Sequence, residues 1–223
     1  MTEVDVLVEA VIRDMGDPQG WVVPVEFRDS LALCALNSAY SLRATSAAVT
    51  RLLTRYRAFR PAADTDSGPD LIRAMDDAGG PARFAREVLC NDSKLPGTTR
   101  VRTMGIYEGL SRLAALDTPV TNAEDLRTLT AQTSAPARRA WVSVRGFGPL
   151  AWSYLLMNAG VGTETKPHVM IQRYLTRVLE QDTTHTPLWA RQLLELTAKE
   201  LAVEPRALDR AIWLHESPSS PKL

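Results

Sequence analysis

Side chains that could carry chemistry gather in one stretch of the chain, residues 138–177. Its basic residues outnumber its single acid, Glu164, and they are Arg138, Arg139, Arg145, Lys166, Arg173 and Arg177. His168 lies in the same stretch, and a neutral imidazole can accept a proton. Arginine and lysine side chains bind phosphate oxygens by charge-assisted hydrogen bonds. The stretch therefore predicts a phosphate-binding surface in a chain that also offers a candidate base.

Two short helices separated by glycines are predicted at the start of this stretch. The first is predicted over residues 134–144, because Ser134 can cap it and Pro136 suits a first turn. The sequence RGFGP at 145–149 then allows a tight turn, and its proline can open a second helix over 150–159. Amides exposed at such a turn can receive a phosphate. Glycine turns between helices are also common for purely structural reasons.

A third helix is predicted from His168 to Leu179, with Pro167 opening it. Arg173 and Arg177 are four residues apart, so they share one face of this helix. A solvated helix face is the structural alternative for the pair. Their place after the glycine turn favours contact with phosphate instead.

The sequences RGFGPLAWSYLLMNAG and KPHVMIQRY resemble the helix-hairpin-helix DNA glycosylase superfamily, which includes the endonuclease III and 3-methyladenine glycosylase types. The hallmark of that superfamily is a hairpin of the form L-P-G-V-G, then a helix, then a segment such as K-P-D-x-x-I-x-R. The resemblance is specific over residues 142–173. It implies base excision from double-stranded DNA, and the residues implied to bind DNA are Arg145, Gly146, Phe147, Gly148, Arg173 and Arg177.

Two positions depart from the catalytic pattern of the superfamily. His168 stands where a catalytic aspartate is expected, and Leu150 stands where lyase-competent members carry a lysine. Schiff-base chemistry is therefore not expected. His168 is the candidate catalytic base, and Lys166 is a second candidate, although such a lysine is more often a plain surface charge. His168 could also simply cap the helix that follows it.

The resemblance implies further ligands. Backbone carbonyls of the hairpin would bind a monovalent cation, and these carbonyls belong to Val142, Val144 and Phe147. No iron–sulfur cluster or other cofactor is expected, because the chain has only Cys34 and Cys90. Trp152, Tyr40 and Tyr107 could stack against an extruded base, although single aromatic residues more often belong to a core.

Helical periodicity covers most of the remaining chain, and no strand pattern is found, so the fold class is all-α with about ten helices. A mostly apolar helix over 25–40 is expected to be central. Thr98 or Thr99 is predicted to cap a helix that runs to Leu116.

The superfamily's fold implies a two-lobed helical bundle. Residues 30–160 would form a helical barrel that ends in the helix-hairpin-helix. Residues 1–29 together with 161–223 would form a second helical lobe.

The charge balance limits the kinds of partner. Lys and Arg number 26 and Asp and Glu number 26, so the formal net charge is zero. Such a chain is not expected to coat nucleic acid non-specifically, although a local basic footprint remains compatible with it. No apolar run could span a bilayer, and the N-terminus lacks the form of a signal peptide. A monomeric cytoplasmic protein without a membrane partner is expected.

Three functions remain open on the sequence alone. The first is a monofunctional DNA glycosylase that hydrolyses the N-glycosidic bond of a damaged base. The second is a non-catalytic DNA-binding or lesion-sensing protein with the same fold. The third is a helical scaffold with no nucleic-acid partner.

Overall fold

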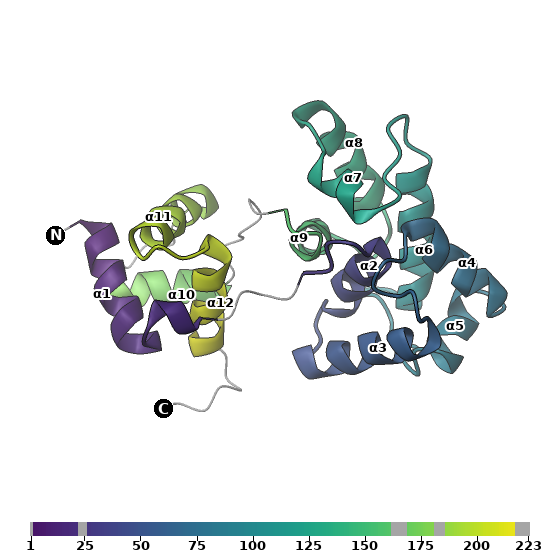
Figure 1. Ribbon diagram of the computed structural model, residues 1–223, viewed down its shortest axis with the longest axis horizontal. Helices are drawn as coiled ribbons and strands as arrows, with labels where there is room; N and C mark the ends of the chain where they lie inside the picture. The colour runs from purple at the N-terminus through teal and green to yellow at the C-terminus, as the bar shows by residue number, and fades with distance from the viewer. Residues whose placement is uncertain (1, 22–25, 162–168, 181–185, 217–223) are drawn as a thin grey trace. The chain divides into compact units, whose positions relative to one another are not determined.

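The computed structural model describes residues 2–21, 26–161, 169–180 and 186–216. These residues form twelve α-helices, one short 3-10 helix and no strand, which confirms the all-α prediction (Figure 1). None of the described helices is both long enough and apolar enough to cross a membrane. The chain divides into two compact units, named here the central unit (Glu26–Val161) and the terminal unit (Met1–Val25 with Gly162–Leu223).

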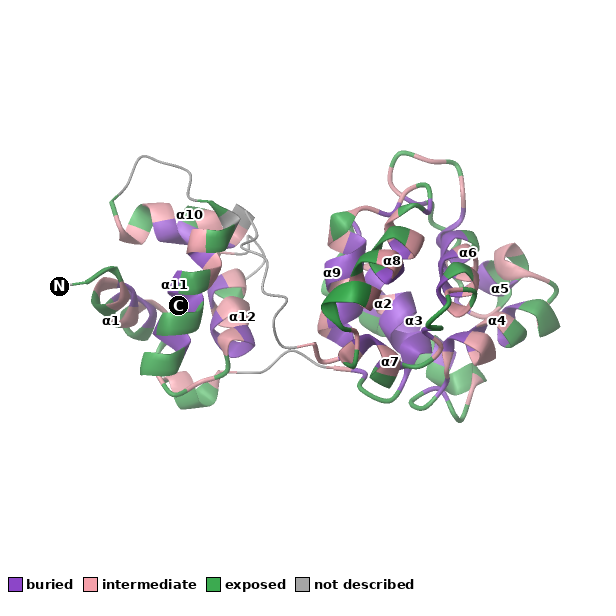
Figure 2. Ribbon diagram, turned by 90° about the horizontal axis from the view of Figure 1, so that it is seen from above, coloured by how far each residue is buried: buried purple, intermediate pink, exposed green. Residues whose placement is uncertain are grey.

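The central unit is organised around helix α2. Its helices are α2 (Leu31–Tyr40), α3 (Ser46–Phe59), α4 (Gly68–Asp77), α5 (Pro81–Glu87), α6 (Arg102–Ala114), α7 (Ala123–Arg127), α8 (Ala131–Val142) and α9 (Pro149–Asn158). All residues of α2 except Asn37 are buried, and α2 contacts α3, α4, α6 and α9 (Figure 2). The expectation of a central apolar helix is therefore confirmed. The Ser38 hydroxyl donates to the Ala151 carbonyl at 2.6 Å, which satisfies the polar group inside this core.

The two ends of the central unit lie side by side. The Phe27 amide donates to the Asn158 carbonyl at 2.6 Å. Gly160 has φ +82, and a Cβ there would lie 2.7 Å from a carboxylate oxygen of Glu26, which pairs with Arg28 at 2.8 Å. Only glycine fits so close to this ion pair with that backbone conformation.

A separate core forms in the terminal unit. Its described helices are α1 (Glu3–Met15), the 3-10 helix η1 (Pro18–Gly20), α10 (Val169–Val178), α11 (Pro187–Glu200) and α12 (Pro205–Glu216). Leu7 and Val11 of α1 are fully buried among Ile171 of α10, Leu194 of α11 and Ile212 of α12. Helix α1 therefore packs against three helices that come much later in the sequence.

Candidate phosphate-binding surface at the turn between α8 and α9

Helix α8 begins at Ala131 and not at Ser134, so the predicted start is wrong. The Thr130 hydroxyl accepts a hydrogen bond from the Thr133 amide, and the Thr133 hydroxyl accepts one from the Thr130 amide. This exchange satisfies the free amides of the first turn before Ser134 is reached, and Pro136 lies inside the helix.

The hairpin turn, residues 143–148, joins α8 to α9. The Phe147 amide donates to the Val144 carbonyl at 2.9 Å, and the Val144 amide donates to the Trp141 carbonyl at 3.2 Å. Gly146 has φ +98, a conformation that other residues adopt only with strain. Gly148 then caps α9 without any side-chain hydrogen bond. The turn thus lies at the glycines that the sequence singled out.

Helix α6 supports the hairpin turn through two glycines, four residues apart. A Cβ at Gly109 would lie 2.7 Å from the indole ring of Trp141. A Cβ at Gly105 would lie 2.5 Å from a methyl carbon of Leu95 and 3.5 Å from Phe147. Because these glycines have no side chain, the aromatic rings below the turn reach the backbone of α6. The position of the turn is therefore set by contact with α6.

A second segment, the 93–102 loop, reaches the hairpin turn from the other side. The Leu95 amide donates to the Arg100 carbonyl at 2.9 Å, and the Thr98 hydroxyl donates to the Leu95 carbonyl at 3.0 Å. That hydroxyl also accepts the Arg100 amide at 3.1 Å. The prediction that Thr98 or Thr99 caps α6 is wrong, because the Thr98 hydroxyl is used within the loop and α6 begins only at Arg102.

Arg102 anchors the base of the 93–102 loop to helix α2. Its side chain is 6% exposed and donates to the carbonyls of Ala39 and Leu42 and to the Ser93 hydroxyl, the last two at 2.9 Å. These carbonyls belong to the C-terminal end of α2 and the residues after it, where a positive charge is favoured. Burial lowers the pKa of Arg102. The sequence reasoning did not identify this residue, because its partners are carbonyls.

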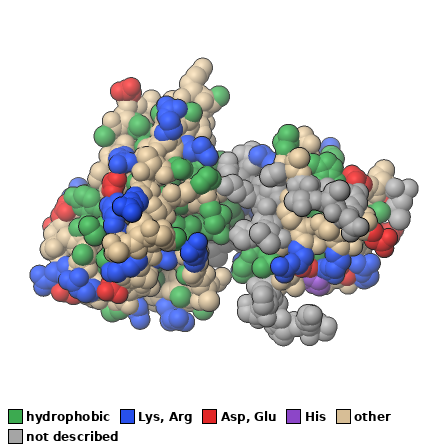
Figure 3. Space-filling model, turned by 180° about the vertical axis from the view of Figure 1, so that it is seen from behind, with side chains coloured by type: hydrophobic (Ala, Val, Ile, Leu, Met, Phe, Trp, Pro, Cys, Tyr) green, Lys and Arg blue, Asp and Glu red, His purple; other side chains and the backbone are tan. Residues whose placement is uncertain are grey.

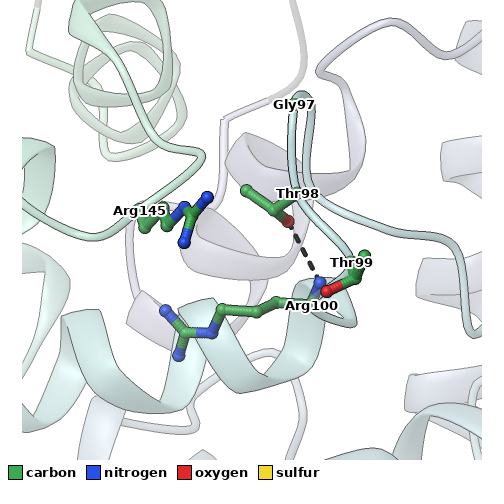
Figure 4. A pocket seen from close by; sticks show the side chains of 5 residues that line it. All are labelled: Gly97, Thr98, Thr99, Arg100 and Arg145. Atoms are coloured by element: carbon green, nitrogen blue, oxygen red, sulfur yellow. Dashed lines mark hydrogen bonds between the residues drawn. The ribbon is translucent and has the colours of Figure 1, made fainter.

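The 93–102 loop and the hairpin turn enclose a surface pocket of about 430 Å³. The two segments touch closely, since a Cβ at Gly146 would lie 2.6 Å from the Cβ of Leu95. The pocket is lined by Gly97, Thr98, Thr99, Arg100 and Arg145 (Figure 4). In Figure 4 the Arg145 side chain extends from the hairpin turn toward Thr98, and the Arg100 side chain runs below it along α6.

The two arginines of the pocket differ in their partners. Arg100 pairs with Glu108 at 2.6 Å, and Glu108 also pairs with Arg112 at 2.6 Å. Arg145 is exposed and has neither an ion pair nor a side-chain hydrogen bond within the part of the chain that the structure describes. Arg145 therefore offers its full hydrogen-bonding capacity to a ligand.

The other predicted phosphate ligands lie on two helices. Arg138 and Arg139 are exposed on α8 and have no ion pair with a described residue. Arg173 is exposed on α10 of the terminal unit, whereas Arg177 pairs with Glu216 of α12 and lies over the ring of its neighbour Tyr174. Figure 3 shows Lys and Arg side chains spread over one face of the central unit. Their spread fits a chain without net charge, in which only local surfaces are basic.

The aromatic residues proposed for a base pocket lie in the central unit. Trp152 on α9 is 4% exposed and Tyr40 on α2 is 2% exposed. The Tyr40 hydroxyl donates to the Asn91 carbonyl at 3.0 Å, and burial raises its pKa. Tyr107 on α6 is half-buried, and its hydroxyl donates to Asp76 at 3.3 Å. A base could stack on Trp152 or Tyr40 only if their neighbours moved.

The predicted catalytic residues, His168 and Lys166, lie outside the described residues. The Val144 carbonyl, one of those predicted to bind a cation, already accepts a hydrogen bond from the Phe147 amide at 2.9 Å. Among the described residues, no three His, Cys, Asp or Glu side chains are grouped so that they could bind a metal ion. The cation site and the catalytic assignment stay predictions.

The chain matches a described protein family. No curated protein and no solved structure matches the chain. The family described as "Domain of unknown function (DUF8548)" matches residues 5–217, which is nearly the whole chain, and the protein therefore belongs to that family.

Proposed function

We propose that the central unit binds the phosphate backbone of duplex DNA through a hairpin surface, which consists of Arg138, Arg139 and residues 145–148. The observation that carries the proposal is the guanidinium of Arg145, which has no ion pair among the described residues and belongs to a turn whose backbone is fixed on both sides. Because the backbone of the turn is already ordered, the Arg145 side chain is the part that loses conformational freedom when it meets a phosphate.

The backbone after Arg145 supports the same proposal. Gly148 has nothing within 4 Å of the place where a Cβ would be, and it gives α9 no side-chain cap. Pro149 has no amide hydrogen, and the amides of Ala151 and Trp152 donate to the Gly148 carbonyl, so the Leu150 amide is the donor that a phosphate can approach at the start of α9. Two further exposed cations on α8 would extend the contact to neighbouring phosphates.

Base excision is the reaction that the resemblance adds to DNA binding. It requires a group near the sugar that stabilises positive charge or activates water, and the residue at that position is His168. We propose this activity on the strength of the sequence match KPHVMIQRY. Non-catalytic lesion binding is the alternative, and the two differ in whether any base is released.

The test measures duplex binding as a function of salt concentration for the native protein and for Arg145→Ala. Loss of one phosphate contact should weaken binding to all sequences alike and reduce the salt slope by about one. Arg51→Ala is the matched control, because Arg51 is an exposed arginine on α3 without an ion pair among the described residues. Unchanged affinity and slope in Arg145→Ala would show that the hairpin surface does not bind DNA.

A further inference from the structure

We infer that the pocket between the hairpin turn and the 93–102 loop binds one backbone phosphate of the DNA, which is held by Arg145 from one segment and by Thr99 from the other. The inference rests on the proposed DNA binding and adds a second contact segment to it. The two segments are far apart in the sequence, and they line one pocket of about 430 Å³.

The hydrogen bonds of the loop leave Thr99 free. The Thr98 amide donates to the Leu95 carbonyl at 3.1 Å, and the Arg100 amide donates to the Thr98 hydroxyl at 3.1 Å. The amide and the hydroxyl of Thr99, which lies between them, have no partner in the described part of the chain, and the residue is exposed. Thr99 thus offers two donors next to each other, and an anionic oxygen can accept both.

The charges around the pocket favour a phosphodiester. Arg145 is unpaired, while Arg100 and Arg112 share the single carboxylate of Glu108. Arg100, Arg112 and Glu108 together carry one surplus positive charge, and Arg145, which lines the same pocket as Arg100, adds another. Because Arg100 is already paired, Arg145 is the cation that can reach a phosphate without breaking an ion pair.

The geometry of the pocket is fixed from both sides. Arg102 ties the base of the loop to α2. The close contact between Gly146 and Leu95 fixes the distance between the two segments. The Thr99 amide belongs to this fixed backbone and needs little reordering when a phosphate binds, so its hydrogen bond contributes more of its strength to affinity.

The first experiment compares duplex binding by the native protein, Thr99→Val and Thr54→Val. Valine keeps the shape of threonine and removes the hydroxyl, and Thr54 is an exposed control whose hydroxyl donates within α3. A hydrogen bond to a charged group is lost in Thr99→Val, so we expect roughly tenfold weaker binding, with Thr54→Val unchanged. If Arg145→Ala weakens binding while Thr99→Val changes it less than twofold, the pocket inference is wrong and the proposed DNA binding stands. If neither variant weakens binding, both are wrong.

The second experiment follows the backbone amide signals of the pocket by NMR. On addition of a short duplex the Thr99 amide should shift strongly, whereas the Thr98 amide, which already donates to Leu95, should shift much less. Inorganic phosphate at matched ionic strength forms the second arm. A Thr99 shift with inorganic phosphate and none with the duplex would overturn the assignment to DNA and leave a site for free phosphate.

Discussion

The rings of Trp141 and Phe147 stack against each other below the hairpin turn, with their centroids 4.8 Å apart and their planes 29° from parallel. Trp141 belongs to α8 and Phe147 to the turn, so the stack closes the turn on itself. Gly109 of α6 lies directly against the indole ring. The backbone that presents Arg145 is therefore supported by an aromatic pair that only a glycine on α6 accommodates.

Gly109→Ala should destabilise the central unit by about 1–2 kcal/mol. The new Cβ would lie 2.7 Å from the fully buried Trp141 ring, and overpacking of this kind typically costs about 1–3 kcal/mol. The greater helix propensity of alanine offsets up to about 1 kcal/mol of that cost. Urea denaturation measures the change in the free energy of unfolding.

A double-mutant cycle isolates the cause of that change. Trp141→Phe removes the atoms that the new methyl group meets, so Gly109→Ala should cost less in the Trp141→Phe background than in the native one. An equal cost in both backgrounds would show that the clash with Trp141 is not the reason.

Glu108→Gln should strengthen DNA binding. The carboxylate pairs with Arg100 and Arg112 at 2.6 Å each, and its removal frees Arg100 beside the pocket. One additional phosphate contact should steepen the salt slope by about 0.9. Glu87→Gln serves as the control, since Glu87 is exposed on α5 and its ion-pair partner among the described residues is Arg83. Weaker or unchanged binding by Glu108→Gln would argue against a phosphate near Arg100.

His168→Asp should create or raise base release from duplexes that carry alkylated or deaminated bases. On the proposed base-excision function, the substitution introduces the carboxylate that the glycosylase pattern has at this position, and one positioned catalytic group is typically worth about 10²–10⁴-fold. Base release is measured on labelled duplexes, with His168→Asn as the uncharged control. If the native protein and the Asp variant both bind DNA and neither releases a base, the non-catalytic alternative is correct.

Asp209→Asn should alter the dependence of stability on pH. Asp209 is partly buried on α12, and desolvation raises its pKa to about 6, against the smaller opposite effects of Arg206 and Arg210. The folded state keeps this proton between about pH 4 and pH 6 whereas the unfolded state releases it, so stability falls as pH rises through this range.

In Asp209→Asn the free energy of unfolding should not fall between about pH 4 and pH 6. This variant should therefore be more stable than the native protein at pH 7.5, by on the order of 1–2 kcal/mol. Denaturation at pH 4.5, 6 and 7.5 measures the difference. Glu9→Gln, which removes an exposed carboxylate on α1, is the control for the loss of one acidic charge. Parallel profiles for the native protein and Asp209→Asn would contradict the raised pKa.

Helix boundaries at a proline or a glycine were more predictable than helix starts at a serine or threonine. The start of α9 at Pro149 and its end shortly before Gly160 follow from the conformations that proline and glycine prefer. Helix α2, by contrast, begins at Leu31 and not near residue 25, because the buried Ser30 hydroxyl accepts the Leu33 amide at 3.2 Å. Serine and threonine cap many turns, so local sequence does not decide which of several candidates begins the helix.

The candidate surface was predictable only where its residues are neighbours in the sequence. The glycine turn was identified from the sequence RGFGP, and Arg145 from the basic stretch and the family resemblance. The 93–102 loop was not, because its contact with the turn depends on Leu95 meeting Gly146 across a long sequence separation. The pairing of Arg177 with Glu216 was missed for the same reason.

The adjacent ends of the central unit determine the order in which the protein can fold. During synthesis, α1 emerges first, but its partners α10, α11 and α12 follow only after the whole central unit has been made. The apolar face of α1 can be buried only after these helices have been made, because Leu7 and Val11 belong to the core that they form. Once the central unit folds, the hydrogen bond between Phe27 and Asn158 joins its two ends, and the long loop between α1 and α10 becomes a short one. We therefore expect the central unit to fold first and to lower the entropy cost of assembling the terminal unit.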